Sequence, residues 1–123
     1  NAAELSQVAA RIYATVVSVP SEDYAVLDGG TKTFPMDIML DQAPYYYNSY
    51  AMIVGREDLE LRRMNEEHGI VKSTKGKVDL QVGQVLELMP IHVCTAVNMQ
   101  NNVYIYDGET LRKEKVAGRG MLF

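Results

Sequence analysis

Short apolar stretches separated by turn-forming residues are the feature of this sequence that most constrains its fold. The stretch from Ile12 to Val19 is β-branched and stops at Pro20, "YAVL" ends at the glycine pair of "DGG", and "VYIY" is followed by "DGE". Stretches of this length and composition are typical of β-strands, and their close spacing is typical of a barrel or sandwich. The sequence therefore predicts a mainly β protein with a single antiparallel, β-barrel-like domain.

The middle of the chain is assigned by the same criteria. "SEDY" indicates a turn, "AMIVG" a strand, and residues 31–50 a long irregular loop, because Pro35 and Pro44 interrupt them. The charge spacing of "REDLELRRMNEEHGIVK" is compatible with a helix. We prefer a strand, a turn and a second strand, because Gly69 and the β-branched pair after it suit a sheet.

The last third of the chain is also expected to be β. A hairpin tip is predicted at Lys75-Gly76, followed by alternating apolar residues at Val78, Leu80 and Val82 and a turn at Gly83. "HVCTAVNM" and "VYIY" flank "QNN", which predicts a tight hairpin, since asparagine tolerates left-handed conformations. The strand "YAVL" is expected to end at the glycine pair of "DGG", because glycine permits positive φ.

Size, charge and cysteine content limit the classes of protein to consider. The chain has 123 residues, 47% hydrophobic and 23% charged, which suits one soluble domain. A formal net charge of -4 without a basic cluster argues against a nucleic-acid surface. One cysteine cannot form an internal disulfide, and no apolar run is long enough to span a bilayer, so a cytoplasmic location is expected.

The start of the chain lacks a methionine and opens with Asn1-Ala2-Ala3. We interpret residues 1–10 as a linker or cloning remnant with a possible helix, and residues 11–123 as the domain. This start favours a domain cut from a longer protein.

His92 and Cys94 are the most distinctive pair of side chains in the sequence, one of two histidines and the only cysteine. In a strand, residues two positions apart share a face, so imidazole and thiolate would converge on one ion. Zinc accepts both donors, usually in a shell of four, so two ligands leave an open site. The alternative is a buried cysteine that packs as a small hydrophobe beside a hydrogen-bonded histidine. The spacing alone leaves both open.

Two further stretches carry chemically active groups. In "NEEHGIVK", Glu66 and Glu67 beside His68 could act in acid-base chemistry or orient the histidine, or could form a solvated charge cluster. Lys32 could be a Schiff-base nucleophile only if burial lowered its pKa. A solvated or phosphate-facing lysine is the more common case. The tyrosine run from Tyr45 to Tyr50 indicates packing or an interface.

Taken in order, five segments resemble one enzyme family. "ATVVSVP", "AVLDGGTKTFPMD", "NEEHGIVK", "VGQVLELMPIHVC" and "VYIYDGETLRKEKVAGRG" are similar to the C-terminal domain of the D-serine dehydratase and D-threonine aldolase family. These are pyridoxal-phosphate enzymes of the alanine-racemase fold type. The resemblance runs from about Ala14 to about Gly120, and its most specific parts are "EEHG" and "P-x-H-x-C".

The resemblance implies a role for each candidate residue. His92 and Cys94 match the family's metal-ligand pair, which implies a Zn²⁺ half-site beside the substrate, and a cysteine at the second position favours zinc and the dehydratase branch. His68 matches a motif near the active site and is expected to contact or organise it. Lys32 matches a loop position and is not the Schiff-base lysine.

The resemblance also implies what this chain does not contain. In the family, an N-terminal barrel domain carries the lysine that binds pyridoxal 5'-phosphate, and the enzymes are homodimers. We therefore expect a missing barrel domain, a D-amino-acid substrate, and no activity of this chain alone. Two alternatives remain: a D-threonine aldolase-type domain that supports retro-aldol cleavage, and a non-catalytic β-barrel module in which His92 and Cys94 are buried.

Overall fold

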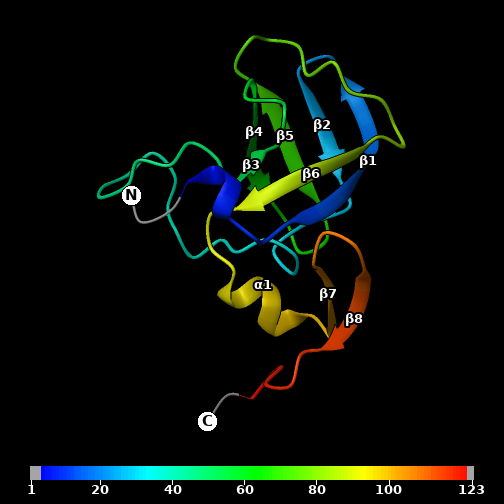
Figure 1. Ribbon diagram of the computed structural model, residues 1–123. Helices are drawn as coiled ribbons and strands as arrows, with labels where there is room; N and C mark the ends of the chain where they lie inside the picture. Colours follow the sequence, from blue (N-terminus) through cyan, green and yellow to red (C-terminus); the bar gives the residue numbers. More distant parts are fainter. Residues whose placement is uncertain (1–3, 122–123) are drawn as a thin grey trace.

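A computed structural model of the chain, which describes residues 4–121, shows a closed antiparallel barrel of six strands (Figure 1). The strand order around the barrel is β1-β2-β5-β4-β3-β6. The predicted mainly β fold is confirmed. The strand bounds are β1 (Ile12–Ser21), β2 (Tyr24–Leu27), β3 (Ala51–Ile53), β4 (Leu59–Met64), β5 (Gly69–Ser73) and β6 (Val85–Pro90).

Four shorter elements lie outside the barrel. A 3-10 helix, η1 (Leu5–Gln7), precedes β1, and a short helix, α1 (Cys94–Met99), follows β6. A separate two-stranded sheet is formed by β7 (Asn102–Tyr106) and β8 (Leu111–Lys115). Figure 1 shows α1 and this hairpin together at one end of the barrel. Neither helix has the length and apolar character needed to cross a membrane.

The long strand β1 closes the barrel because its two halves pair with different neighbours. Residues 12–15 pair with β6, and the part from Val16 to Ser21 pairs with β2. Register shifts interrupt the pairing on either side of Ser18. Irregularities of this kind bend a strand and increase its twist, which a small closed barrel requires.

Alternation along each strand fills the barrel interior. The side chains of Val16, Leu27, Leu61, Val71 and Leu88 are fully buried in one apolar cluster. Their neighbours along the strands are exposed or half-buried, except Met89 after Leu88, which is also buried. This period of two is the pattern from which the strands were predicted.

Two predicted strands are absent from the described part of the chain. Residues 77–82 form no strand, although Val78 and Leu80 are buried as their alternation suggests. The hairpin predicted across "QNN" is also wrong, because β7 pairs with β8 and the segment before it contains α1. The turn in "DGE" and the strand-turn-strand interpretation of residues 56–72 are confirmed. Strand β1 continues one residue past Pro20.

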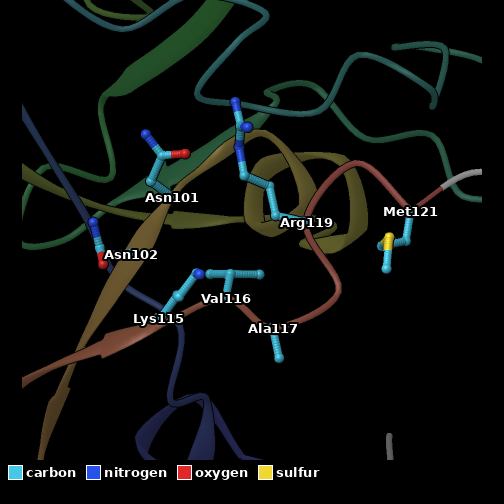
Figure 2. A pocket seen from close by; sticks show the side chains of 7 residues that line it. All are labelled: Asn101, Asn102, Lys115, Val116, Ala117, Arg119 and Met121. Atoms are coloured by element: carbon cyan, nitrogen blue, oxygen red, sulfur yellow. The ribbon is translucent and has the colours of Figure 1, made fainter.

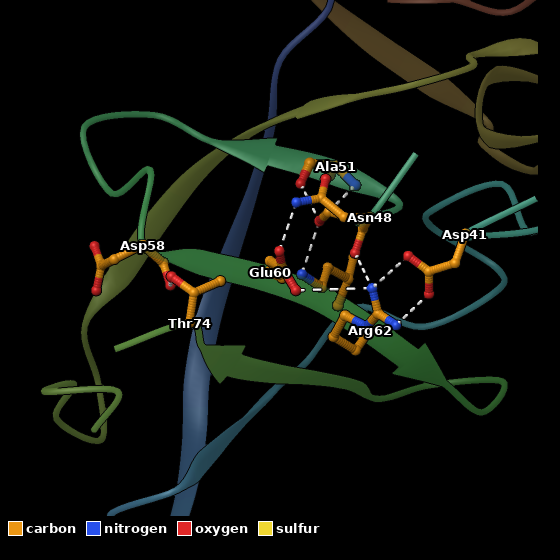
Figure 3. A network of polar contacts seen from close by, with 9 residues as sticks. Asp41, Asn48, Ala51, Asp58, Glu60, Arg62 and Thr74 are labelled. Carbon is orange, nitrogen blue, oxygen red and sulfur yellow. Dashed lines mark hydrogen bonds and ion pairs between the residues drawn. The ribbon is translucent and has the colours of Figure 1, made fainter. Parts of the chain in front are cut away.

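The loop predicted at residues 31–50 is confirmed as part of an irregular segment from 28 to 50, and an arginine on β4 anchors it (Figure 3). Arg62 forms an ion pair with Asp41, at 2.6 Å between Nη2 and Oδ2, and donates to the Asn48 carbonyl oxygen at 2.5 Å. Its Nη1 also lies 3.7 Å from Glu60 Oε2. Because Asp41 and Asn48 belong to the loop, these two contacts of one guanidinium hold the far part of the loop against the barrel.

A second arginine holds residues 77–82 against the barrel. Arg56 donates two hydrogen bonds of 2.9 Å to the Asp58 carboxylate and one of 2.7 Å to the Val78 carbonyl oxygen. The hydrogen bonds from Arg56 lower the pKa of Asp58 to about 2. The ion pair therefore remains intact well below neutral pH.

We predict that Asp58→Asn removes part of the acid sensitivity of this chain. Because the pKa of Asp58 is lower in the folded state, its ionised form stabilises the fold above pH 4, and this contribution is lost as pH falls toward about 2. Urea unfolding across this pH range should show a shallower decline for the variant. Asp23→Asn, at an exposed turn outside the Arg56 pair, is the control and should decline like the parent chain. Equal pH profiles for Asp58→Asn and the parent would contradict the prediction.

Candidate metal site

His92 and Cys94 lie at the transition from the barrel to α1, and not in a strand. Strand β6 ends at Pro90, and Cys94 is the first residue of α1. The prediction that both side chains share one face of a sheet is therefore wrong. The Cys94 thiol is exposed and the His92 side chain is 34% exposed, so neither is a packed core residue. Both donors remain accessible to an ion or a partner.

The irregular loop brings a carboxylate to His92. Asp37 Oδ2 lies 2.5 Å from His92 Nδ1, although 55 positions separate the two residues. An ionised carboxylate only accepts hydrogen bonds, so the imidazole donates through Nδ1. This leaves Nε2 as the atom with the free lone pair. Within residues 4–121, no set of three or more His, Cys, Asp or Glu side chains is arranged to hold a metal ion.

The donor set fits zinc chemically. Thiolate and neutral imidazole are ligands that zinc prefers, and a carboxylate on the second nitrogen of the histidine is a common partner in zinc sites. Two ligands leave coordination positions for groups from outside the described residues. The predicted pair is thus suited to a metal that a second protein surface or a substrate completes.

His68 lies on the turn between β4 and β5 and is exposed. The turn is closed by the Asn65 side chain, whose Oδ1 accepts from the His68 backbone N–H at 2.7 Å. No hydrogen bond or ion pair joins the His68 ring to His92 or Cys94 in the part of the chain that the structure describes. The structure therefore does not bring the predicted catalytic histidine into direct contact with the metal pair.

The loop after β2 connects this turn to α1. Backbone N–H groups of Thr31 and Lys32 donate to the carbonyl oxygens of Asn65 and Glu66, at 2.8 and 3.2 Å. The Lys32 carbonyl oxygen accepts from Gln100 Nε2 at 3.1 Å. The motifs "DGGTK" and "NEEHG" are thus in direct contact, and the same loop reaches the end of α1.

Lys32 forms an ion pair with Glu67 at the surface. The hydrogen bond to Glu67 raises the pKa of Lys32 above its ordinary value. A Schiff-base nucleophile requires the opposite shift. The structure therefore agrees with the interpretation of Lys32 as a solvated charge, and Glu67 is the partner of Lys32.

The glycine pair of this loop is required by close packing, and not by positive φ as predicted. Neither Gly29 nor Gly30 has positive φ. A Cβ at Gly30 would lie 2.2 Å from the Asn65 carbonyl oxygen. Only glycine allows the backbones of the loop and the turn to approach this closely.

We predict that Gly30→Ala separates the loop from the turn and destabilises the chain by about 1–3 kcal/mol, the usual range for overpacking. The added methyl group meets backbone atoms, which cannot move aside as a flexible side chain can. Gly118→Ala is the matched control, because no atom lies within 4 Å of its added Cβ. Urea unfolding measures both, and equal stabilities would show that the contact is not tight in solution.

A groove of about 1080 Å³ lies next to the candidate site, between the segment before β1, α1 and the β7–β8 hairpin. One face of α1 lines it with Val93, Ala96, Val97 and Gln100, which follow the helical spacing i, i+3, i+4, i+7. Neither His92 nor Cys94 lines it. The pair therefore lies beside the groove, on either side of Val93.

A smaller hollow of about 430 Å³ lies near the end of the hairpin (Figure 2). It is lined by seven residues, including the cations Lys115 and Arg119. None of the predicted site residues lines it. The segment after β8 is held there by a hydrogen bond of 2.9 Å from the Gly120 N–H to Asn98 Oδ1.

The structure thus combines a closed six-stranded barrel with an accessible His-x-Cys pair after its last strand. Residues 9–106 match the family described as "Putative serine dehydratase domain", and the chain belongs to this family. The resemblance to the D-serine dehydratase and D-threonine aldolase family is confirmed.

Individual relatives agree with this assignment. D-threonine aldolase of Arthrobacter sp. is 29% identical over 110 residues, which are 89% of this chain and 26% of the relative. The crystal structure of D-threonine aldolase from Filomicrobium marinum superposes with a TM-score of 0.73 and 23% identity, covering 92% of this chain and 29% of that one. The chain thus spans less than a third of the length of either protein.

Other solved structures share the fold. An alanine racemase-like protein from Idiomarina loihiensis has a TM-score of 0.70 at 17% identity, over 85% of this chain and 30% of that one. Two variants of D-threo-3-hydroxyaspartate dehydratase have TM-scores of 0.70 and 0.69, each at 16% identity over 85% of this chain, covering 30% and 31% of theirs. One variant has a histidine replaced by alanine. The other has a cysteine replaced and is in the metal-free form.

Asp37 is the residue of this candidate site that the sequence analysis did not identify. It lies in the loop "TKTFPMD", far from His92 along the chain, and it belongs to no recognisable ligand spacing. Neither the residue type nor the local pattern indicates that Asp37 contacts His92. The contact depends on the path of the loop over the barrel.

Proposed function

We propose that this chain is the metal-holding C-terminal domain of a pyridoxal-phosphate-dependent lyase that removes water and ammonia from D-serine-like 3-hydroxy amino acids. The observation that carries the proposal is the accessible His92-x-Cys94 pair in a member of the serine dehydratase family. In the dehydratase variants described above, the substituted histidine and cysteine also stand two positions apart, and the cysteine variant is metal-free. This correspondence supports a Zn²⁺ half-site at His92 and Cys94.

Each group has a defined part in such a site. Bound zinc would supply Lewis-acid polarisation of the substrate β-hydroxyl, and bound pyridoxal phosphate would supply an electron sink for the bond broken at Cα. His92 would bind the metal through Nε2 and Cys94 through its thiolate. His68, on a turn held by the same loop that reaches α1, would organise the wall of the site.

The groove and the hairpin are suited to contact with the rest of the enzyme. In β7 and β8, all residues except Val103 are exposed, among them Tyr104, Tyr106 and Leu111. A two-stranded sheet with this much exposed apolar surface is marginal by itself. We infer that the barrel domain with the cofactor lysine, in the same chain or in a homodimer partner, covers this face and completes the site beside Val93.

The first test replaces the thiolate in the full-length enzyme that contains this domain. We predict that Cys94→Ala strongly reduces both zinc content and the conversion of D-serine to pyruvate and ammonia, because the remaining imidazole is a single protein ligand from this domain. Thr95→Ala, at the next exposed position of α1, is the matched control and should keep both. Zinc is measured by elemental analysis and turnover by pyruvate release, with and without a chelator. Full turnover after complete metal removal would overturn the zinc role.

The aldolase alternative rests on a specific observation, the 29% identity to D-threonine aldolase of Arthrobacter sp.. Product analysis on D-threonine separates the two reactions. Dehydration gives a 2-oxo acid and ammonia, whereas retro-aldol cleavage gives glycine and an aldehyde. We predict that 2-oxobutanoate and ammonia predominate. The soft thiolate of Cys94 favours zinc over harder metals, and by family resemblance a cysteine at this position favours the dehydratase branch. Glycine and acetaldehyde as main products would establish the aldolase reaction instead.

A further inference from the structure

The contact between Asp37 and His92 is the feature of the described surface that the family assignment leaves unexplained. The two side chains come from different parts of the fold, the loop after β2 and the connection after β6, and they meet at 2.5 Å. Both are partly exposed, at 42% and 34%. An exposed pair of this kind adds little to stability. Its effect is on the state of the imidazole.

A neutral imidazole has one protonated and one unprotonated nitrogen, and a carboxylate selects between the two tautomers. Because the carboxylate accepts, the tautomer with the proton on Nδ1 is stabilised. The lone pair is then on Nε2, and the hydrogen bond also fixes the orientation of the ring. A histidine without this partner would divide between both tautomers and several rotamers.

We propose that Asp37 is a positioning residue that holds His92 in the Nδ1-protonated tautomer and thereby prepares Nε2 to bind the metal. The part that concerns the metal rests on the function proposed above, whereas the tautomer can be tested without any metal. In this arrangement, the loop from Gly29 to Asn48 places the Asp37 carboxylate against His92. Its anchors, the contact of Gly30 with the turn and the Arg62 ion pair with Asp41, lie on either side of Asp37 along the chain.

The first experiment reads the tautomer directly. Long-range ¹H–¹⁵N NMR spectra of the labelled chain, at a pH where imidazole is neutral, distinguish the two nitrogens of each ring. His68 is the internal reference, because it is the other histidine and is solvent-exposed. We expect His92 in the Nδ1-protonated form and His68 in the mixture typical of exposed histidine.

Variants separate a positioning role from a structural one. In Asp37→Ala, the His92 signals should move to the pattern of His68. In Asp37→Asn they should keep the Nδ1-protonated form, because the amide oxygen still accepts a hydrogen bond. Met36→Ala, at the adjacent exposed position, is the control and should leave His92 unchanged. The backbone amide spectrum shows whether each variant keeps the barrel. An unchanged His92 tautomer in a folded Asp37→Ala chain would overturn the proposal.

The second experiment measures zinc affinity in the full-length enzyme by competition with a chelator. Loss of the partner of a metal-binding histidine typically weakens binding by about 10–100-fold. We expect a loss of this size for Asp37→Ala, a smaller loss for Asp37→Asn and none for Met36→Ala. An equal loss for the asparagine and alanine variants would identify Asp37 as a metal ligand, and no loss in either would remove its role toward the metal. Both results overturn the proposal. Unchanged affinity in Cys94→Ala would instead overturn the proposed metal site itself.

Discussion

Hydrogen bonding of β1 to both β2 and β6 is the interaction on which the rest of this structure depends. β1 is the first strand of the barrel along the chain and β6 the last, so their pairing closes the barrel. The bend near Ser18 allows one strand to serve both neighbours. Closure fixes Pro90 at the end of β6 beside the segment before β1, and the groove lies where these parts meet α1 and the hairpin. The position of the His-x-Cys connection is thus a consequence of barrel closure.

Much of the barrel could be predicted from the sequence, because its strands alternate between core and surface and end at turn-forming residues. The errors occur where residues alternate between buried and exposed positions, or are β-branched, but do not pair with a neighbouring strand. Val78 and Leu80 alternate and are buried, yet their segment is held by Arg56 and not by a neighbouring strand. The segment "HVCTAVNM", which contains α1, was predicted as a strand because it holds several β-branched residues. It is helical in the structure, where Val93, Ala96 and Val97 place one face on the groove, so tertiary contacts override local propensity.

The candidate site shows the same division between local and long-range information. The pair His92 and Cys94 was predicted from residue type, spacing and family resemblance; the structure shows both side chains accessible, but the strand geometry used to justify the prediction was wrong. The contact with Asp37 could not be found, because it depends on the path of an irregular loop across 55 positions. The glycine pair was recognised for its flexibility, whereas the structure uses the absence of a side chain at Gly30. Close backbone contacts of this kind leave no periodic pattern in a sequence.

In the proposed enzyme, a half-site at the edge of the exposed groove would couple metal binding to domain assembly. Two protein ligands from this chain would bind an ion weakly, so most of the affinity would come from groups that approach across the groove. In the proposed enzyme, covering the hairpin and completing the metal shell are therefore parts of one event. By linkage, domain docking strengthens metal binding by the same free energy by which the bound metal strengthens docking. A pre-set imidazole lowers the cost of that event, because His92 need not change tautomer or rotamer when the remaining ligands arrive. The carboxylate of Asp37 would then matter most in the assembled enzyme, and least for the stability of the barrel that carries it.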